Sequence, residues 1–333
     1  MSSTTSKRRS SNLLERSLVR EGSTPEPRVS SPAEVTSAAA SALVLGYSAP
    51  LPGTGSRYLD GPVAHETRLM GIPALAAAAS GAAGRPVGGT VLEAVLGSLS
   101  LAGHADLRAA GYLTPLARAA LLGERLGKVL AGLSHEDIRP FARALEAADS
   151  GHQGQPRTRT YRSGRRAGTL ASALDFAAGA GQGATLRDAM RFAATEDPGD
   201  PMAREYVKNF EVTLGLARPA LSNALTRVES TRPALVQAYL EILAEVPDLD
   251  AARRAGLGEA EEVSRMAHGV LKVGGVYSRR GLQAISNLDG LLRSDPRLEP
   301  SATEPPVVAA AFLLALEQGP GYLGGRVRPA PRR

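Results

Sequence analysis

The sequence predicts an all-α fold, in one large domain built from helices that are rich in alanine and leucine. Hydrophobic residues make up 43% of the 333 residues and aromatic residues only 4%, so the core must consist mainly of Ala, Leu and Val side chains. Alanine, leucine, glutamate and arginine are strong helix formers. The apolar–polar alternation typical of half-buried strands is missing from the sequence. Helices with such small side chains are expected to pack closely.

The first half of the chain is predicted to contain five helices. The loop 50–62 is punctuated by Pro and Gly, which interrupt helices and favour turns. Ser134 and Asp137 match a capping box, in which each side chain bonds the backbone N–H of the other residue. A helix is therefore expected to start directly after Ser134. The helical ranges expected here are 33–47, 66–82, 89–102, 112–132 and 135–149.

Three stretches are predicted to be irregular. Residues 150–183 are rich in Gly, Arg, Gln and Ser, which is typical of a flexible insertion, with one short helix expected around LASALDFAA, 170–178. Residues 1–34 form a basic lead-in of Ser, Arg and Pro, and residues 319–333 form a basic tail. Such compositions favour disorder because they offer too little apolar surface to bury. The helical domain is therefore expected to span 35–318.

The second half has a more regular helical pattern. Thr185 and Asp188 match a second capping box. The long helical segment 200–228 is expected to bend or break at Pro219, because proline removes a backbone donor. Thr231 is the expected N-cap of the next helix, with a proline in its first turn. Helices are expected over 185–194, 200–228, 231–246, 248–256, 258–275, 278–295 and 304–319, with C-terminal stops at Gly256, Gly274 and Gly319.

Composition excludes several classes of site. The chain has no cysteine, so it has no disulfide, thiolate nucleophile or Cys-ligated metal. Its five histidines are scattered, which argues against a His-based metal centre. It contains no phosphate-binding P-loop, no GxGxxG after a strand and no HExxH. No apolar run reaches membrane-spanning length, and the N-terminus lacks the hydrophobic segment of a secretion signal. A cytoplasmic protein without a membrane partner is the expectation.

The net charge of +6 raises the question of a nucleic-acid partner. The excess is concentrated in two segments, with five Arg and no acid in 151–169 and four Arg in 324–333. A solvated basic loop and tail is the favoured interpretation, since charge runs are usually solvated. Nucleic-acid binding through these segments remains a weaker alternative.

Four segments of the second half carry the pattern of a known family. The four segments are MAREYVKNFEVTLGLARPAL (202–221), AYLEILAEVPDLDAARRAG (238–256), AEEVSRMAHGVLKVGG (260–275) and LDGLLRSDPRLEPSATEPPVVAAAFLLAL (288–316). With these segments in this order, the chain resembles the triphosphoribosyl-dephospho-CoA synthase family, especially its archaeal and methylotroph-type branch. The resemblance covers most of residues 36–317 and is clearest over 184–317.

This resemblance implies a fold and a reaction. Members of the family are all-helical. In the family reaction a ribose hydroxyl of dephospho-CoA attacks the anomeric carbon of ATP and expels adenine, and the product supplies the prosthetic group of certain acyl carrier proteins. ATP and Mg²⁺ are the implied cofactors, and a nucleotide and a CoA-like molecule are the implied partners. The branch is associated with one-carbon metabolism, so a one-carbon cofactor precursor is an alternative acceptor. A homodimer is also expected.

The first polar motif of the family is only partly retained. SAPLPGTGSRYLD (48–60) stands where the family has a P-K-P-G loop, but Leu51 replaces the lysine. HET (65–67) lies near the family's acidic pair and keeps only Glu66. The resemblance makes Gly53, Ser56 and Arg57 candidate nucleotide contacts, Asp60 and Glu66 candidate Mg²⁺ ligands, and Glu66 also a candidate catalytic residue. A solvated loop is the alternative for Asp60 and Glu66.

The second motif is the polar stretch GHADLR (103–108), which stands where the family has G-N-T-N-x-G. His104 and Asp106 occupy the two Asn positions and Arg108 occupies the Gly position, while the following LTPLA fixes the register. His104 and Asp106 are candidate catalytic residues, with Asp106 orienting the imidazole or binding metal. The alternative is a polar turn that caps a helix beginning near Tyr112.

The third motif, LEPSATEP (298–305), corresponds to L-N-P-G-T-T-A-D in the family. Thr303 is kept, whereas Glu299 and Ser301 replace Asn and Gly. Glu299 and Thr303 are candidate cofactor contacts. Ser301 and Glu304 also fit a capping box for the helix that follows, and this structural interpretation is favoured.

A basic pair adds two further candidates. Arg253 and Arg254 match basic residues that follow an aspartate in the family. They are candidate phosphate contacts, and an exposed helix end is the alternative.

The changes fall on polar motifs while the apolar helices are kept. Glycine lets a phosphate approach the backbone closely, which Arg108 and Ser301 would obstruct, and Leu51 removes a phosphate-binding charge. Two functions follow as hypotheses. One is a divergent nucleotide-dependent transferase of the phosphoribosyl type, and the other is a catalytically impaired pseudoenzyme that acts as a binding or assembly subunit.

Overall fold

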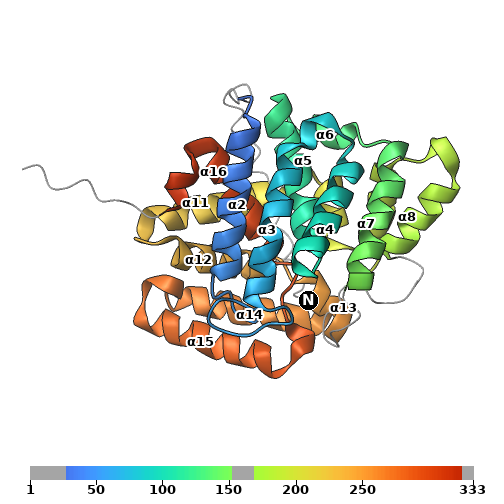
Figure 1. Ribbon diagram of the computed structural model, residues 1–333. Helices are drawn as coiled ribbons and strands as arrows, with labels where there is room; N and C mark the ends of the chain where they lie inside the picture. Colours follow the sequence, from blue (N-terminus) through green and yellow to red (C-terminus); the bar gives the residue numbers. More distant parts are fainter. Residues whose placement is uncertain (1–27, 152–168, 325–333) are drawn as a thin grey trace, which may run out of the picture.

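The computed structural model describes residues 28–151 and 169–324 (Figure 1). Within these residues the chain forms fifteen α-helices, α2 to α16, joined by short 3₁₀ turns, and contains no strand. The all-α prediction is therefore confirmed.

The N-terminal helices α2 to α5 stand side by side (Figure 1). Helix α3 packs against both α2 and α4, and α4 packs against α5 and α7. The helices of this half are α2 (Pro32–Ser48), α3 (His65–Ser80), α4 (Val87–Ala102), α5 (Leu107–Leu122), α6 (Leu126–Ala131) and α7 (Ile138–Gly151).

The C-terminal half covers one side and one end of this group. Helices α12 and α14 pack together, α15 packs against α14, and α13 lies beside α14 (Figure 1). The helices of this half are α8 (Leu170–Gly179), α9 (Leu186–Thr195), α10 (Pro201–Val207), α11 (Arg218–Arg227), α12 (Thr231–Glu245), α13 (Leu249–Ala255), α14 (Leu257–Lys272), α15 (Arg279–Ser294) and α16 (Glu304–Gln318).

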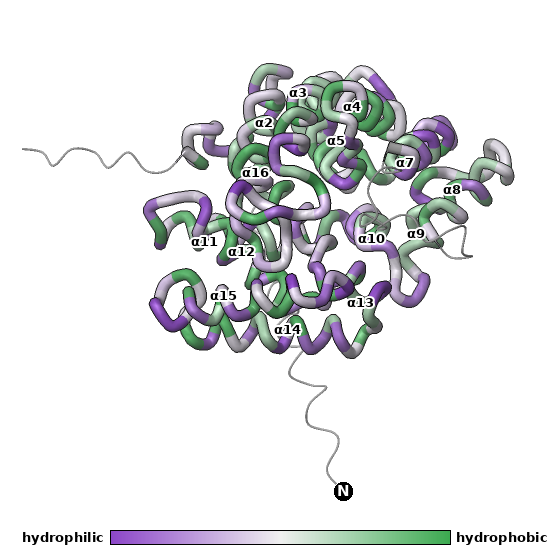
Figure 2. Tube along the Cα trace, turned by 60° about the horizontal axis from the view of Figure 1, so that its bottom comes forward, coloured by the Kyte–Doolittle hydropathy of each residue, from purple (hydrophilic) through white to green (hydrophobic). Residues whose placement is uncertain are grey.

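Helix α16 joins the two halves. It packs against α2 and α5 from the first half and against α11 and α12 from the second (Figure 2). Its residues from Pro305 to Phe312 are all buried. A Cβ at Gly46 of α2 would lie 2.5 Å from a methyl of Val308, so glycine permits this close approach. The start of α16 is thereby carried into the middle of the N-terminal helices, where the candidate site lies.

One expected helix is in fact two. The range 112–132 forms α5 and α6, and α5 begins five residues earlier, at Leu107. The Asp106 carboxylate accepts the N–H of Ala109 and so caps α5. Gly123, with φ of 62°, ends it in the left-handed region that glycine tolerates. The prediction had missed both ends because the apolar pattern runs across them.

The break in the segment 200–228 also lies elsewhere than predicted. Asn209 and Phe210 take left-handed φ values of 54° and 59°, and a π-helix spans Thr213–Ala217. Pro219 follows the π-helix closely within the continuous helical run 211–227, and it does not end the helix. The buried Glu205 stabilises the break by accepting the N–H groups of Val212 and Thr213.

The predicted helix ends are correct at most other positions. Both capping boxes form, at Ser134 with Asp137 and at Thr185 with Asp188. The predicted glycine stops, which are Gly256, Gly274 and Gly319, all have positive φ at helix ends. The prediction that Thr231 is the N-cap of α12 is wrong, because Ser230 takes that position. Thr231 instead donates its hydroxyl to the carbonyl of Leu323.

Part of the predicted irregular stretches is helical. Within 150–183, helix α7 runs to Gly151 and α8 covers 170–179, where it packs against α7 and α9. At the other boundaries, α2 begins at Pro32 and a 3₁₀ turn, Pro320–Leu323, packs on α16. Residues 1–27, 152–168 and 325–333 lie outside the described residues, and with them most of the predicted lead-in, the Arg cluster and the tail.

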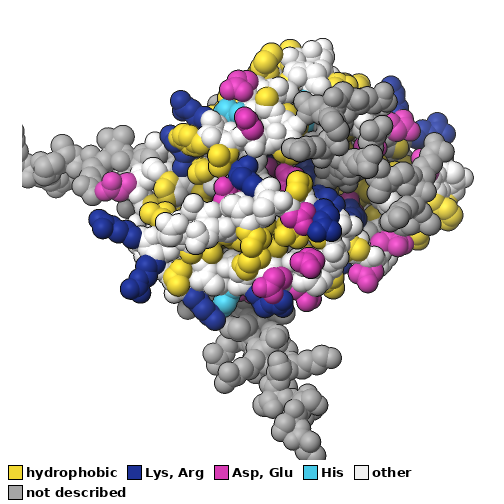
Figure 3. Space-filling view, turned by 90° about the horizontal axis from the view of Figure 1, so that it is seen from below, with side chains coloured by type: hydrophobic (Ala, Val, Ile, Leu, Met, Phe, Trp, Pro, Cys, Tyr) yellow, Lys and Arg dark blue, Asp and Glu magenta, His cyan; other side chains and the backbone are white. Residues whose placement is uncertain are grey.

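Two surface properties bear on the expected partners. None of the described helices combines the length and the apolarity needed to cross a bilayer. On the face shown in Figure 3, Lys and Arg side chains are spread apart, with Asp and Glu side chains among them. The described residues on that face therefore form no concentrated basic surface for nucleic acid.

Candidate functional site

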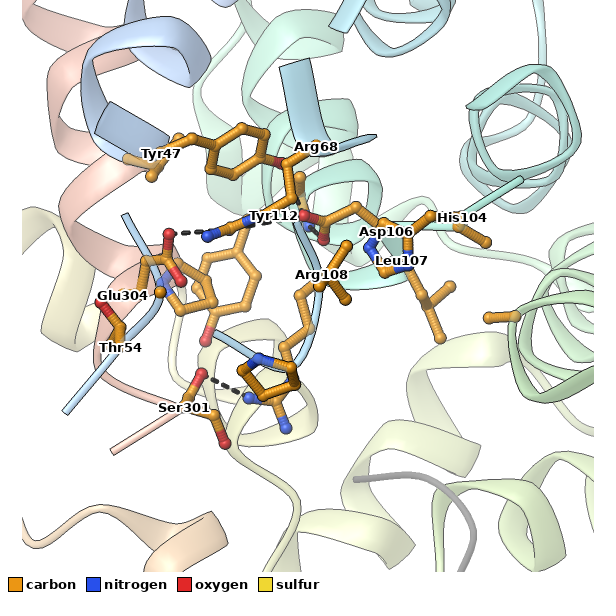
Figure 4. Close-up of a pocket in the computed structure, with 18 of the residues that line it drawn as sticks. Tyr47, Thr54, Arg68, His104, Asp106, Leu107, Arg108, Tyr112, Ser301 and Glu304 are labelled. Carbon is orange, nitrogen blue, oxygen red and sulfur yellow. Dashed lines mark hydrogen bonds and ion pairs between the residues drawn. The ribbon is translucent and has the colours of Figure 1, made fainter. Parts of the chain in front are cut away.

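The candidate site is a cavity where the two halves of the chain meet (Figure 4). The end of α2, the first turns of α3 and α5, the end of α7 and the start of α16 surround it. Two guanidinium groups and four carboxyl groups line it, together with one imidazole. These charged or titratable residues are Arg68, His104, Asp106, Arg108, Asp149, Glu299 and Glu304.

Arg68 lies at the centre of one wall. Its guanidinium donates to Glu304 at 2.7 Å and lies 3.8 Å from the carboxylate of Asp106. It also stacks 3.7 Å above the ring of Tyr47, a cation–π contact (Figure 4). Only 14% of the Arg68 side chain is exposed, so its charge is held in place by two carboxylates and a ring.

Asp106 is held by structural contacts as well. One oxygen caps α5 through the N–H of Ala109, at 2.8 Å, and the other accepts the hydroxyl of Tyr47 at 2.5 Å. Burial would raise the pKa of Asp106, but the charge of Arg68 and the hydrogen bonds outweigh it, so the pKa lies below its usual range. The capping alternative is therefore correct in kind, although the helix begins at Leu107.

Arg108 forms the second charged wall. Its guanidinium pairs with the buried Asp250 and donates to the carbonyl of Ser301 at 2.6 Å. The Ser301 hydroxyl in turn donates to Asp250 at 2.9 Å. A large side chain thus stands in the family's glycine position, with its charge already balanced within the protein.

The predicted capping box at Ser301 and Glu304 does not form. The N-cap of α16 is Thr303, and it makes no side-chain cap. Ser301 and Glu304 instead bond Asp250 and Arg68, so both take part in the walls of the cavity. Burial raises the pKa of Glu304, although Arg68 opposes this. The S-x-x-E pattern was therefore misleading here.

Behind the Arg108 wall, two aspartates fasten α13 to the start of α16. The Asp248 carboxylate accepts the N–H groups of Asp250 and Ala251, and on its other oxygen the N–H of Ala302 and the Thr303 hydroxyl. Burial and the neighbouring Asp250 charge raise the pKa of Asp248 to about 6. Burial also favours a higher pKa for Asp250, but the charge of Arg108 outweighs this effect, so the pKa of Asp250 lies below its usual range.

The raised pKa of Asp248 predicts a pH dependence of stability. A carboxyl whose folded pKa exceeds its unfolded value of 3.8 makes the fold relatively more stable at low pH, and this contribution is lost as pH rises through about 6. Relative to Asp248→Asn, wild type is expected to lose about 2–3 kcal/mol between pH 4 and pH 7. Urea unfolding of both proteins across that range measures it, and a pH-independent difference would contradict it.

The loop between α2 and α3 is clamped from α15. The carboxylate of Asp289 accepts the N–H of Gly53 at 2.8 Å, and Arg293 donates to the carbonyls of Thr54 and Asp60 at 2.6 and 3.2 Å. Arg293 also pairs with Asp289 at 2.9 Å. Because Thr54 lines the cavity, this clamp fixes one of its edges.

Removing the clamp is expected to loosen that edge. Arg293→Ala deletes both bonds to the loop, so amide exchange over residues 53–60 should speed up about 10-fold or more, the equivalent of roughly 1.4 kcal/mol. Hydrogen-exchange mass spectrometry measures the effect. Arg297→Ala is the matched control, because Arg297 is mostly exposed and its side chain pairs with Asp295, two positions away. Equal exchange in both variants would rule the clamp out.

The structure brings together some of the predicted site residues. His104, Asp106 and Glu299 line the cavity, whereas Glu66 is exposed on α3 outside the lining. Burial raises the pKa of Glu299. The other predicted contacts, which are Gly53, Ser56, Arg57, Asp60, Arg253, Arg254 and Thr303, do not line it.

These outlying residues have other surroundings. Arg57 and Asp60 are exposed on the α2–α3 loop. Arg254 donates to the Ser301 hydroxyl at 3.3 Å and to backbone carbonyls of the 297–299 turn, so it supports the motif from behind. Arg253 lies 3.4 Å from Asp200. Leu51, which stands where the family has lysine, is only 1% exposed and packs in the core, so this position does not reach the cavity.

Sequence reasoning missed three residues of the site. Arg68 and Tyr47 were assigned no role. Asp250 was also given none, although Asp248, two positions before it, was matched to an aspartate of the family. A charged side chain directly before the small and apolar run LMGIPALAAAA was the available signal for Arg68. No sequence signal could pair Arg108 with Asp250, which lie 142 positions apart.

The described residues do not build a metal cage from protein ligands alone. No group of three or more His, Asp or Glu side chains able to hold a metal occurs among them. Of the predicted Mg²⁺ ligands, Asp106 is engaged by Tyr47 and Ala109, and Asp60 and Glu66 lie elsewhere. Mg²⁺ often uses one or two carboxylates together with substrate phosphates instead of a cage of protein ligands.

Comparison with known proteins gives one match. The family model described as CitG, ATP:dephospho-CoA triphosphoribosyl transferase, matches residues 33–322. The match starts one residue into α2 and ends in the 3₁₀ turn after α16, so it includes every described helix and both walls of the cavity. No curated protein and no solved structure matches the chain.

Proposed function

Because the chain belongs to the ATP:dephospho-CoA triphosphoribosyl transferase family, we propose that it is a divergent nucleotide-dependent transferase whose nucleotide binds in the cavity between α2, α3, α5 and α16. The observation that carries this proposal is the pair of largely buried guanidinium groups on two walls of one cavity. The side chains of Arg68 and Arg108 are 14% and 11% exposed. Such cations can stabilise the negative charge of a polyphosphate.

The other lining groups suit a group transfer between polar substrates. His104 and Glu299 line the cavity, whereas Asp106 caps α5. The raised pKa of Glu299 makes it a candidate proton donor to a leaving base, and His104 a candidate acceptor of the proton from the attacking hydroxyl. Bound Mg²⁺ would neutralise part of the phosphate charge. Dephospho-CoA and a one-carbon cofactor precursor are the two acceptors to be compared.

One observation favours a second candidate, a family member that binds but does not catalyse. Each cavity guanidinium already has an internal counterion, Glu304 for Arg68 and Asp250 for Arg108. A phosphate must therefore replace an existing ion pair, which reduces its net gain. With four carboxyl groups in the lining, the cavity also repels a polyphosphate that lacks metal.

Calorimetry and an adenine-release assay test the proposal. Titration with ATP and Mg²⁺ should give a dissociation constant in the micromolar to millimolar range, and adenine should appear when the correct acceptor is added. Binding of ATP without adenine release from either acceptor would favour the binding subunit. Absence of any ATP binding at millimolar concentration would overturn the transferase.

The residue in the glycine position separates the two candidates. If Arg108 contacts phosphate, Arg108→Gly combined with Asp250→Asn should weaken ATP binding about 10- to 100-fold, the loss expected for charged hydrogen bonds. If Arg108 blocks the old site, the same double variant should bind ATP more tightly. The Asp250 change is included because removing Arg108 alone would leave the buried Asp250 with the more distant Arg253, at 3.8 Å.

A further inference from the structure

A second cavity lies on the opposite side of the segment that begins α16. The first cavity is lined by Ser301, Glu304 and Pro305, and the second by Ala302, Thr303 and Pro306. Tyr112 belongs to both linings. The other walls come from α10, from the start of the helical segment after it, and from the connection between α12 and α13.

The walls of this cavity are mostly apolar. Ile242, Val246 and Leu249 line one side, and Val212 and three prolines complete the surface. Apolar walls with a few polar groups are typical of small-molecule sites, because the walls remove ligand surface from water while the polar groups orient it. The site would therefore accept a short hydrocarbon chain or ring.

The cavity also contains a guanidinium whose charge is not balanced within the described residues. Arg204 lines it, is only partly exposed, and makes no side-chain hydrogen bond or ion pair with any of the residues the structure describes. This distinguishes Arg204 from Arg68 and Arg108, which are both neutralised by carboxylates. At the rim, Lys208 pairs with Glu211 at 3.1 Å, and both are exposed.

The acidic groups of the lining do not serve Arg204. The Glu205 carboxylate accepts the N–H groups of Val212 and Thr213 at 2.9 and 3.0 Å. The Asp248 carboxylate is fully used by α13 and by the Ala302–Thr303 backbone and hydroxyl donors. Both carboxylates are buried and accept hydrogen bonds from protein donors. The charge of the cavity that has no counterion among the described residues is therefore the positive charge of Arg204.

We propose that this second cavity is a binding site for a small amphipathic anion, a ligand whose phosphate or carboxylate bonds Arg204 and whose apolar part packs against Ile242 and Leu249. Arginine matches such planar or tetrahedral anions through paired N–H donors. The apolar part adds affinity in proportion to the surface it buries. The site is separate from the nucleotide cavity, and the proposal does not depend on transferase activity.

Calorimetry with simple probes tests the two halves of the proposal. Hexyl phosphate and hexanoate carry both features, inorganic phosphate carries only the anion, and hexanol carries only the chain. We expect hexyl phosphate or hexanoate to bind at least 10-fold more tightly than either single-feature probe, and their order distinguishes a phosphate site from a carboxylate site. If neither exceeds inorganic phosphate and hexanol, the proposal is overturned.

Two variants locate the binding. Arg204→Gln removes the cation and should weaken the preferred probe 10-fold or more, and it should fold normally because Arg204 has no partner among the described residues to lose. Leu249→Phe fills the apolar side and should also abolish binding. The matched control is Arg191→Gln on α9, an exposed arginine. Unchanged binding in Arg204→Gln, with melting temperatures equal to wild type, would contradict the site.

Discussion

Replacing Asp250 with alanine is expected to lower the free energy of unfolding by about 3–5 kcal/mol, because it leaves the guanidinium of Arg108 without its counterion in a largely buried position. The side chain of Asp250 is 1% exposed, and it also accepts the hydroxyl of Ser301. Urea unfolding near pH 7 measures this change. The loss should exceed that of any substitution of an exposed ion pair, for which about 1 kcal/mol is the upper range.

A double substitution separates the charge from the packing. Arg108→Met with Asp250→Leu replaces the buried pair by apolar groups of similar reach, and should recover most of the stability lost in Asp250→Ala. Glu93→Ala is the control, because its pair with Arg85 is about half exposed. If Asp250→Ala costs no more than Glu93→Ala, Arg108 and Asp250 are not coupled as the structure describes.

Substituting Arg68 by glutamine is expected to lower kcat/KM for adenine release about 100-fold or more, as loss of a preorganised cation at a polyphosphate does. Arg68 is the cavity cation that stacks on a ring and bonds a carboxylate at once, so its position is defined before any ligand arrives. The assay is adenine release with ATP, Mg²⁺ and the acceptor identified by screening.

Glu304 supplies the control for this prediction. Arg68→Gln leaves the Glu304 carboxyl buried without its partner, and its raised pKa means that it can respond by binding a proton. The double variant Arg68→Gln with Glu304→Gln should therefore restore stability without restoring activity. Arg85→Gln, an exposed change, should alter neither. Activity retained in Arg68→Gln would remove Arg68 from the site.

The internal ion pairs determine how the first cavity can work. A ligand phosphate that binds Arg68 or Arg108 exchanges one anion for another, so much of the electrostatic gain is offset by the contacts it breaks. Selectivity then depends on the other polar groups that line the cavity, among them His104 and Glu299. The second cavity differs because its Arg204 has no counterion in the part of the chain that the structure describes.

The sequence was a good guide wherever the deciding interaction is local. Alanine- and leucine-rich periodicity predicted the all-α fold, and the capping boxes at Ser134 and Thr185 formed as predicted. These features depend on residues within one helical turn. The family resemblance also relied on ordered apolar helices, which tolerate little change in volume, and it is confirmed over 33–322.

Local patterns failed where a distant partner competes for the same side chain. Ser301 and Glu304 had the spacing of a capping box, yet Asp250 and Arg68 engage them from other helices. Likewise Pro219 was expected to break a helix, but the break lies at Asn209 and Phe210, where Glu205 holds the backbone. A local pattern indicates which nearby partners a side chain can have, but the fold decides whether a distant residue binds that side chain instead.

The sequence alone therefore determined the fold class, the family and the loop that carries His104 and Asp106, because hydrophobic periodicity and the order of motifs can be recognised without knowing which residues are in contact. Only the tertiary structure decided that Asp106 is a helix cap, that Arg68 and Arg108 are paired within the protein, and that Arg204 has no partner among the described residues. The physical reason is that the balance of a buried charge depends on which residues the helices bring within a few ångströms, and this is set by packing across more than a hundred residues of chain.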